Sequence, residues 1–290
     1  MKVWAAIRRQ LVDLMVYLAL PLVSVVFPAS WSRALVARGS NFDWLLASEA
    51  QAAFSSAAEF VDIADEQAWK ARWKQVEMLD VRDMYMMSFG RTRAVLSEVE
   101  CKVPLEVAKD RVLIGMHWGP SISILKLLQE NGLDPALPYR RPEKQIFRIR
   151  PFYYVFLSLA ARHIVKTMGE RAVPIGGAGK ALRAMMDQPG SVIVVMDAPP
   201  RKDRPMLRAQ VLGKGANFDE GFPTILSDKE KSYVFYALSL QPGGLVKKKL
   251  ELEGPFTSSE AQEFVERYAG FLERHLASDP AQWRIWHVAG

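Results

Sequence analysis

Cysteine and histidine are scarce in this chain of 290 residues, and their scarcity excludes several kinds of site. Cys101 is the only cysteine, so neither an intrachain disulfide nor a thiolate metal cage can form. No two of the four histidines share a helical spacing with a carboxylate, so a zinc site is not expected. The Gly-x-Ser-x-Gly nucleophile elbow and the Walker phosphate loop are also missing.

Neither sign of charge dominates the composition. There are 38 Lys and Arg against 32 Asp and Glu, which gives a formal net charge of +6. This modest basic excess suits nucleic acid, anionic lipid or an acidic protein, and does not choose among them. No nucleic-acid-binding motif accompanies it, so a nucleic-acid partner is not expected. Half of the residues are apolar and 24% are charged, which favours a large core over a disordered chain.

One stretch near the N-terminus, residues 14–31, has no charged residue and follows a short basic segment. It is slightly short for a membrane span and is interrupted by Pro21 and Pro28. A spanning helix would keep its basic end in the cytoplasm, whereas a monotopic helix would place Tyr17 and Trp31 at headgroup depth. A buried core helix and a cleaved secretory signal are the alternatives. We expect residues 1–38 to be a membrane-anchoring segment.

The remainder, residues 39–290, alternates strand-like and helix-like patterns without repeats or low-complexity linkers. This alternation predicts a single α/β domain with a mostly parallel central sheet flanked by helices. The predicted strands are 103–107, 112–116, 136–139, 191–196, 232–240 and, as an edge strand, 247–252. The predicted helices are 40–64, 65–89, 124–130, 152–168, 180–186, 218–227 and 258–277.

The segment Arg111–Pro120 stands at the centre of the pattern, because a buried strand there runs into a tight turn and a helix start. His117 lies in that turn, close to the free N–H groups expected at the start of a helix. A histidine placed there can act as a base beside a developing oxyanion. The amides that follow Trp118 and Gly119 are the expected oxyanion donors.

Several pieces of the chain match one family in the same order. They are the apolar N-terminus, Gly115–Gly119, Tyr139–Pro142, Leu182–Pro200 and Pro280–His287. Together they resemble the bacterial lipid A biosynthesis (late) acyltransferases, which are related to the glycerolipid acyltransferases. The resemblance implies a glycerolipid-acyltransferase-like fold at the cytoplasmic face of the bacterial inner membrane. It also implies transfer of a fatty acyl group from an acyl carrier protein or coenzyme A thioester to a hydroxyl or amine of a membrane-associated lipid or glycolipid. No cofactor is implied, and the thioester is the co-substrate.

The chain departs from that family at one position. The family places an acid five residues after the histidine, where it is thought to orient the imidazole, and here that position is Ile122. Ser121 or Ser123 could orient His117 weakly. Asp197 could do so better, because the carboxyl ends of strands in an open α/β sheet share one crevice. Otherwise catalysis is lost, and the chain is a lipid-binding or scaffold relative of the same fold.

The resemblance therefore implies His117 as general base, with Asp197 as its substitute partner. The basic surface of the chain would suit an acidic carrier protein. Arginines of the chain would meet phosphate on the donor or acceptor. The expected substrate-binding residues are Trp118, Gly119, Ser121, Arg140, Arg141 and Arg201.

Overall fold

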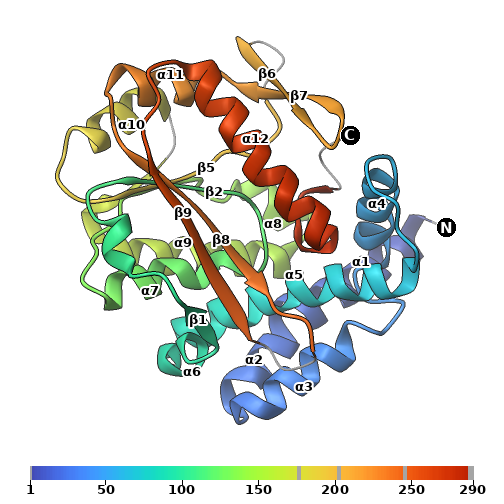
Figure 1. The fold of residues 1–290 in the computed structure, drawn as a ribbon. Helices are drawn as coiled ribbons and strands as arrows, with labels where there is room; N and C mark the ends of the chain where they lie inside the picture. Colours follow the sequence, from blue (N-terminus) through green and yellow to red (C-terminus); the bar gives the residue numbers. More distant parts are fainter. Residues whose placement is uncertain (1, 175–177, 201–203, 244–246, 287–290) are drawn as a thin grey trace.

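The computed structural model describes residues 2–174, 178–200, 204–243 and 247–286. Its main sheet has five strands in the order β1–β9–β8–β2–β5 (Figure 1). Three of the four strand pairs are parallel, and only β8 and β9 run antiparallel. The predicted α/β class with a mostly parallel sheet is therefore confirmed. The strands are β1 Val99–Cys101, β2 Val112–Gly115, β3 Leu137–Tyr139, β4 Ala172–Pro174, β5 Val192–Val195, β6 Met206–Val211, β7 Lys214–Asp219, β8 Tyr233–Leu240 and β9 Lys248–Phe256.

The helices surround this sheet. The longest, α5, begins after Asp65, whose side chain accepts a hydrogen bond of 2.9 Å from the amide of Ala68. Such a cap satisfies one of the N–H groups that a helix start leaves without a partner. The α-helices are α1 Lys2–Leu14, α2 Leu20–Val26, α3 Ala29–Gly39, α4 Ala47–Ala58, α5 Glu66–Ser88, α6 Thr92–Leu96, α7 Ile124–Glu130, α8 Lys144–Ile149, α9 Pro151–Met168, α10 Ala178–Met186, α11 Gly221–Asp228 and α12 Ala261–Ser278.

The sheet has an apolar core on each face. Side chains alternate along β2, so Leu113 packs with α7 and α9, while Val112 and Ile114 pack with α12. Every residue of β2 and of β8 is buried, as expected for strands covered on both faces. Figure 1 shows the strands running between α12 and the pair α7 and α9. The ends of the central strands are therefore held rigidly, which matters for the side chains that follow them.

The first two helices form a nearly continuous rod, because a π-helical turn at Met15–Ala19 joins α1 to α2. Pro21 lies two positions after this widened turn, in the first turn of α2, where a proline is tolerated. The expected interruption at Pro21 is therefore wrong, whereas the helix does end before Pro28. Within the described residues, the stretch Trp4–Val26 is long and apolar enough to cross a membrane, a test that core helices and signal sequences also pass.

One side of this N-terminal rod is buried and the other is exposed. Val12, Val16 and Tyr17 belong to the same apolar core as the sheet, and the Tyr17 carbonyl accepts a hydrogen bond from Tyr85 of α5. The core is therefore continuous between the first helices and the rest of the molecule. The exposed large apolar side chains of the first three helices and the turn between them are Trp4, Ile7, Leu11, Leu22, Val23, Val26, Phe27 and Trp31.

Two predictions about the strands are wrong, and one hairpin was missed. Residues 103–107 form no strand, because the chain pairs earlier, at β1, and then turns through a 3-10 helix at Leu105–Ala108. The strand at 247–252 is not at the edge, since β1 covers it. Lys248 of this strand is fully buried against Asp83, so its charge does not indicate a solvent-exposed strand. Finally, the β6–β7 hairpin was not predicted, and it occupies the start of the helix expected at 218–227.

Candidate active site

His117 and Asp197 meet at the carboxyl ends of two neighbouring strands. β2 and β5 pair in parallel with Gly115 opposite Val195, and each of the two residues follows its strand by two positions. This register places both side chains at one edge of the sheet. The Nδ1 atom of His117 lies 2.7 Å from Oδ1 of Asp197. The structure thus brings together the two residues predicted to be catalytic.

The Asp197 side chain is fully buried, and its carboxylate accepts three hydrogen bonds. Besides the imidazole, the backbone N–H of His117 donates to Oδ2 at 2.6 Å. The indole Nε1 of Trp283 also donates to Oδ2 at 2.6 Å. A carboxylate on Nδ1 selects the tautomer in which Nδ1 carries the proton. The neutral imidazole of His117 therefore keeps its lone pair on Nε2.

The imidazole of His117 remains accessible, since its side chain is 41% exposed. Desolvation lowers the pKa of His117, whereas the charge of Asp197 and its hydrogen bond raise it, and the net shift of the pKa is upward. The charge of Arg284 opposes this shift and that of Glu77 adds to it. His117 is therefore a reachable base whose protonated form is stabilised by a buried partner.

The turn after His117 is built around Gly119 and Trp118. Gly119 has φ = 58°, and a Cβ there would lie 1.9 Å from the carbonyl oxygen of Leu238, so the position requires glycine. The indole of Trp118 is 1% exposed and donates a hydrogen bond of 2.9 Å to Ser239. Trp118 therefore supports the turn from inside, and its predicted contact with substrate stays a prediction.

The expected oxyanion donors of this turn are already occupied. The amide of Trp118 donates to the carbonyl of Met116 at 2.7 Å, and that of Gly119 donates to the carbonyl of Gln282 at 2.9 Å. The amide of Ser121 donates to Gly119 at 3.0 Å, and Pro120 has no N–H. An oxyanion on a substrate would thus need a donor outside the turn, contrary to the prediction.

The residues that follow the turn do not orient the imidazole. Ser123 is buried, and its hydroxyl has no hydrogen-bond partner in the part of the chain that the structure describes. Ser121 is half-buried and contributes the backbone contact to Gly119. Ile122, which stands where the family has its acid, packs into the apolar core. Its amide donates a hydrogen bond of 3.0 Å to Asp80 of α5.

Of the three arginines predicted to bind phosphate, Arg140 and Arg141 are not part of this arrangement. Arg140 pairs with Glu143 at 2.8 Å, and both side chains are exposed. Arg141 is exposed as well. Among the described residues, neither arginine has a recorded contact with the His–Asp pair, and Arg201 lies outside the described residues.

The C-terminal segment Pro280–Trp286 holds the turn after His117 from the other side, and its role was not predicted. Gln282 receives the amide of Gly119, Trp283 donates to Asp197, and the amide of Arg284 donates to the carbonyl of His117 at 2.8 Å. Trp118 and Trp283 also form an isolated antiparallel bridge. The Gln-Trp pair near the end of the sequence was the available signal, but nothing in its spacing points to Asp197, which lies 86 positions earlier.

Two acids of α5 fasten this segment and the turn together. Arg284 donates to Glu77 at 2.8 Å and to Asp80 at 2.7 Å. Asp80 also accepts the amide of Ile122 through its other oxygen. The helix, the turn and the C-terminal segment therefore form one hydrogen-bonded unit around His117.

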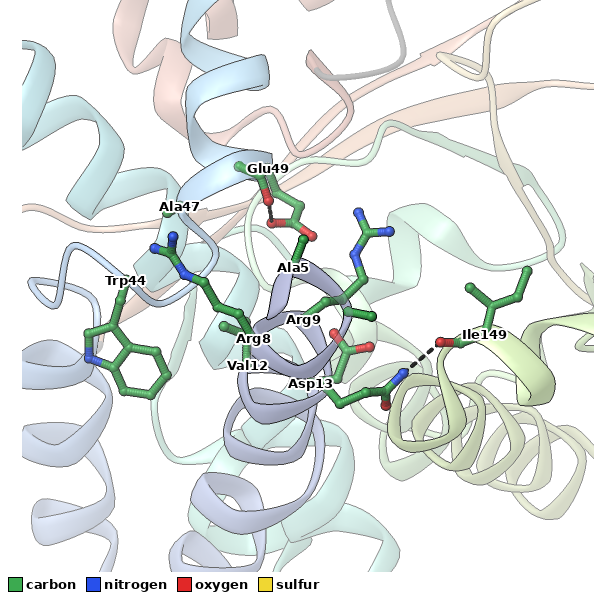
Figure 2. Close-up of a pocket in the computed structure, with 12 residues that line it drawn as sticks. Ala5, Arg8, Arg9, Val12, Asp13, Trp44, Ala47, Glu49 and Ile149 are labelled. Carbon is green, nitrogen blue, oxygen red and sulfur yellow. Dashed lines mark hydrogen bonds between the residues drawn. The ribbon is translucent and has the colours of Figure 1, made fainter. Parts of the chain in front are cut away.

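A cavity of about 740 Å³ lies elsewhere, between α1, α4 and the end of α8, and neither His117 nor Asp197 lines it (Figure 2). Arg8 and Arg9 extend from α1 on the exposed side of that helix (Figure 2). Asp13 lies along its wall and accepts two hydrogen bonds from Arg150, at 2.6 and 2.8 Å. This cavity is charged and is separate from the His–Asp pair.

Within the described residues, no group of three or more His, Cys, Asp or Glu side chains is arranged to hold a metal ion. No protein-family model and no curated protein matches the chain.

Proposed function

We propose that this protein is an acyltransferase that moves a fatty acyl group from an acyl thioester to a hydroxyl or amine. The observation that carries the proposal is the His117–Asp197 pair. An accessible imidazole with Nδ1 bound to a buried carboxylate is the arrangement that general-base catalysis requires. Asp197 supplies the orienting acid that the sequence lacks after the histidine.

In the proposed reaction, Nε2 of His117 removes the proton from the acceptor O–H or N–H as the acceptor oxygen or nitrogen attacks the thioester carbonyl carbon. The resulting imidazolium is stabilised by Asp197, which stays ionised. The tetrahedral intermediate then expels the thiolate with cleavage of the C–S bond. The thiolate takes the proton from the imidazolium, so the products are the acylated acceptor and a free thiol.

The proposed donor is an acyl carrier protein or coenzyme A thioester, and the proposed acceptor is a lipid or glycolipid in a membrane. The exposed apolar side chains of α1 to α3 support a membrane location, because such a patch is costly to leave in water. The proposed place of action is the cytoplasmic face of the bacterial inner membrane. The reaction as written needs no cofactor other than the thioester co-substrate.

One observation favours the alternative, a lipid-binding or scaffold protein without activity. The amides beside His117 are engaged within the protein, so the turn offers no ready oxyanion site. Preorganised donors of that kind commonly contribute a factor of about 10²–10³ to acyl transfer. The rate of acyl transfer by the purified protein therefore distinguishes the enzyme from the lipid-binding alternative.

The test is a mass-spectrometric assay of the purified full chain with acyl thioesters of different chain lengths and a membrane acceptor extract. We expect acyl transfer or slow thioester hydrolysis by the wild type, and neither by His117→Ala. The matched control is His275→Ala, because His275 lies in α12 and contacts Trp118 without contacting Asp197.

Turnover retained by His117→Ala would exclude the proposed mechanism. No reaction of the wild type over the whole donor panel, together with retained binding of fatty acids, would establish the lipid-binding alternative instead.

A further inference from the structure

A second cavity, of about 250 Å³, begins at the partner of His117. Asp197 and Trp283 both line it, so it lies one side chain away from the imidazole. Its other walls come from the end of β5, the β6–β7 hairpin, α12 and the C-terminal segment. Figure 1 shows the hairpin beside α12.

The walls of this cavity are almost wholly apolar. Asp197 is the one charged residue among the described residues that line it, and three hydrogen bonds already occupy its carboxylate. The cavity therefore suits an uncharged apolar group, unlike the cavity beside Arg8 and Arg9. The large apolar side chains of the wall include Phe60, Met196, Phe218, Leu272, Leu276 and Trp286.

The volume limits the size of the occupant. An apolar cavity of about 150 Å³ accepts a six-carbon benzene ring. In proportion, a cavity of about 250 Å³ accommodates about ten carbon atoms. A longer chain would have to leave the cavity or displace its walls, which close-packed interiors resist.

We propose that this cavity holds the apolar end of the transferred acyl chain and that Ala216 sets the longest chain that fits. This inference rests on the proposed acyltransferase function. Ala216 lies on β7, lines the cavity, and packs partly buried against the apolar core. A larger side chain there would occupy the space that the end of an acyl chain needs.

The cross-strand neighbour of Ala216 provides a matched control. Ala209 on β6 is paired directly with Ala216 and also packs against the core, but it does not line this cavity. Ala209→Leu and Ala216→Leu add the same volume to the same hairpin. Only Ala216→Leu should shorten the chain that fits. The opposite change, Phe60→Ala, removes a ring from the wall and should admit longer chains.

The test is calorimetric titration of the full chain with saturated fatty acids from hexanoate to hexadecanoate. Each methylene buried in the wild-type cavity should tighten binding about fourfold. We expect this gain to stop at about ten carbons. The plateau should come about three carbons earlier in Ala216→Leu, stay in place in Ala209→Leu, and move to longer chains in Phe60→Ala.

Equal plateaus in Ala216→Leu and Ala209→Leu, or a plateau unmoved in Phe60→Ala, would overturn the inference. Binding measures the cavity without any turnover, so the two proposals fail separately. A chain-length plateau without transfer would refute the enzyme and retain the cavity assignment. Transfer with product lengths unchanged in Ala216→Leu would retain the enzyme and refute the cavity assignment.

Discussion

The carboxylate of Asp197 has no accessible surface, yet the backbone N–H of His117 and the indole N–H of Trp283 both donate to its Oδ2. A buried carboxylate is costly unless it is hydrogen-bonded in this way. The same contacts leave it only one orientation, with Oδ1 directed at the imidazole of His117. The position of the acid along the chain is therefore less important than the strand register that delivers it.

The first residue-scale prediction concerns the pH dependence of transfer. The neutral imidazole is the base, and the pKa of His117 is raised, so activity should rise with pH through a midpoint above about 6.5. Asp197→Asn removes the negative charge, so the midpoint should move down and kcat should fall about 10³-fold or more. Initial rates between pH 5 and 9 check this. A midpoint that does not move in Asp197→Asn would show that the two groups are not coupled.

The second residue-scale prediction treats Trp283 as a positioning residue. Trp283→Phe removes a hydrogen bond to the buried carboxylate, and leaving that bond unmade should cost about 1–3 kcal/mol of stability. It should also lower kcat with little change in KM, because the acid that holds the base loses its second support. Chemical denaturation and steady-state kinetics measure the two effects.

Tyr85→Phe is the control for Trp283→Phe. The buried hydroxyl of Tyr85 donates to the carbonyl of Tyr17, and neither residue touches Asp197 or lines the cavity beside it. A similar loss of stability with nearly unchanged kcat is expected. If both variants lower kcat equally, the role of Trp283 is only structural.

At the scale of elements, the site depends on a contact between two loops. The turn after β2 and the segment Pro280–Trp286 exchange backbone hydrogen bonds, and α5 fastens both through Glu77 and Asp80. The close approach of the turn to β8 requires glycine at position 119. Chain segments that are far apart in sequence thus share a single geometry.

Gly119→Ala tests this contact. Its Cβ would meet the backbone of β8 at a positive φ, so the variant should lose more than about 3 kcal/mol of stability or unfold. Gly132→Ala is the control, because Gly132 also has a positive φ, of 74°, but nothing lies near its Cβ position. It should lose only about 1–2 kcal/mol. Thermal unfolding followed by circular dichroism compares them, and equal losses would contradict the contact.

At the scale of the whole molecule, the N-terminal helices form part of the core on one side and part of the exposed surface on the other. Their buried side joins the core that supports the sheet, while their other side exposes tryptophan and aliphatic side chains. The exposed set begins with Trp4, which is 76% exposed, and extends to Trp31, which is 65% exposed. Such a surface is suited to insertion into the interface of a membrane.

Vesicle flotation tests this surface. The full chain should float with vesicles that contain anionic lipid, and the double variant Trp4→Glu with Trp31→Glu should float several-fold less, because two charges would enter the interface. Met206→Glu is the control, since Met206 is a 41% exposed apolar residue on the β6–β7 hairpin. Equal flotation of all three proteins would place the membrane contact elsewhere.

Part of the fold was predictable from local patterns. The apolar runs that form β2, β5 and β8 can be recognised in the sequence, because a strand covered on both faces has no solvent-facing side that requires polar residues. β9 was misjudged because its lysines suggested solvent, whereas Lys248 is buried with Asp83. The β6–β7 hairpin was missed because its short strands carry mixed polar and apolar residues around a Leu-Gly turn. Lys248 can be buried only because Asp83 lies beside it, and a partner so distant in the sequence is not visible in a local sequence pattern.

The sequence by itself determined that His117 follows a buried strand in a tight turn and that Asp197 ends another such strand. Periodicity and turn residues are local properties, so they can be read directly from the chain. Only the tertiary structure decided that β2 and β5 are neighbours in register, that the amides beside His117 are already engaged, and that Trp283 closes on Asp197. The contacts of Asp197 with His117 and with Trp283 join residues separated by 80 and 86 positions, and packing, not local propensity, determines which of them meet.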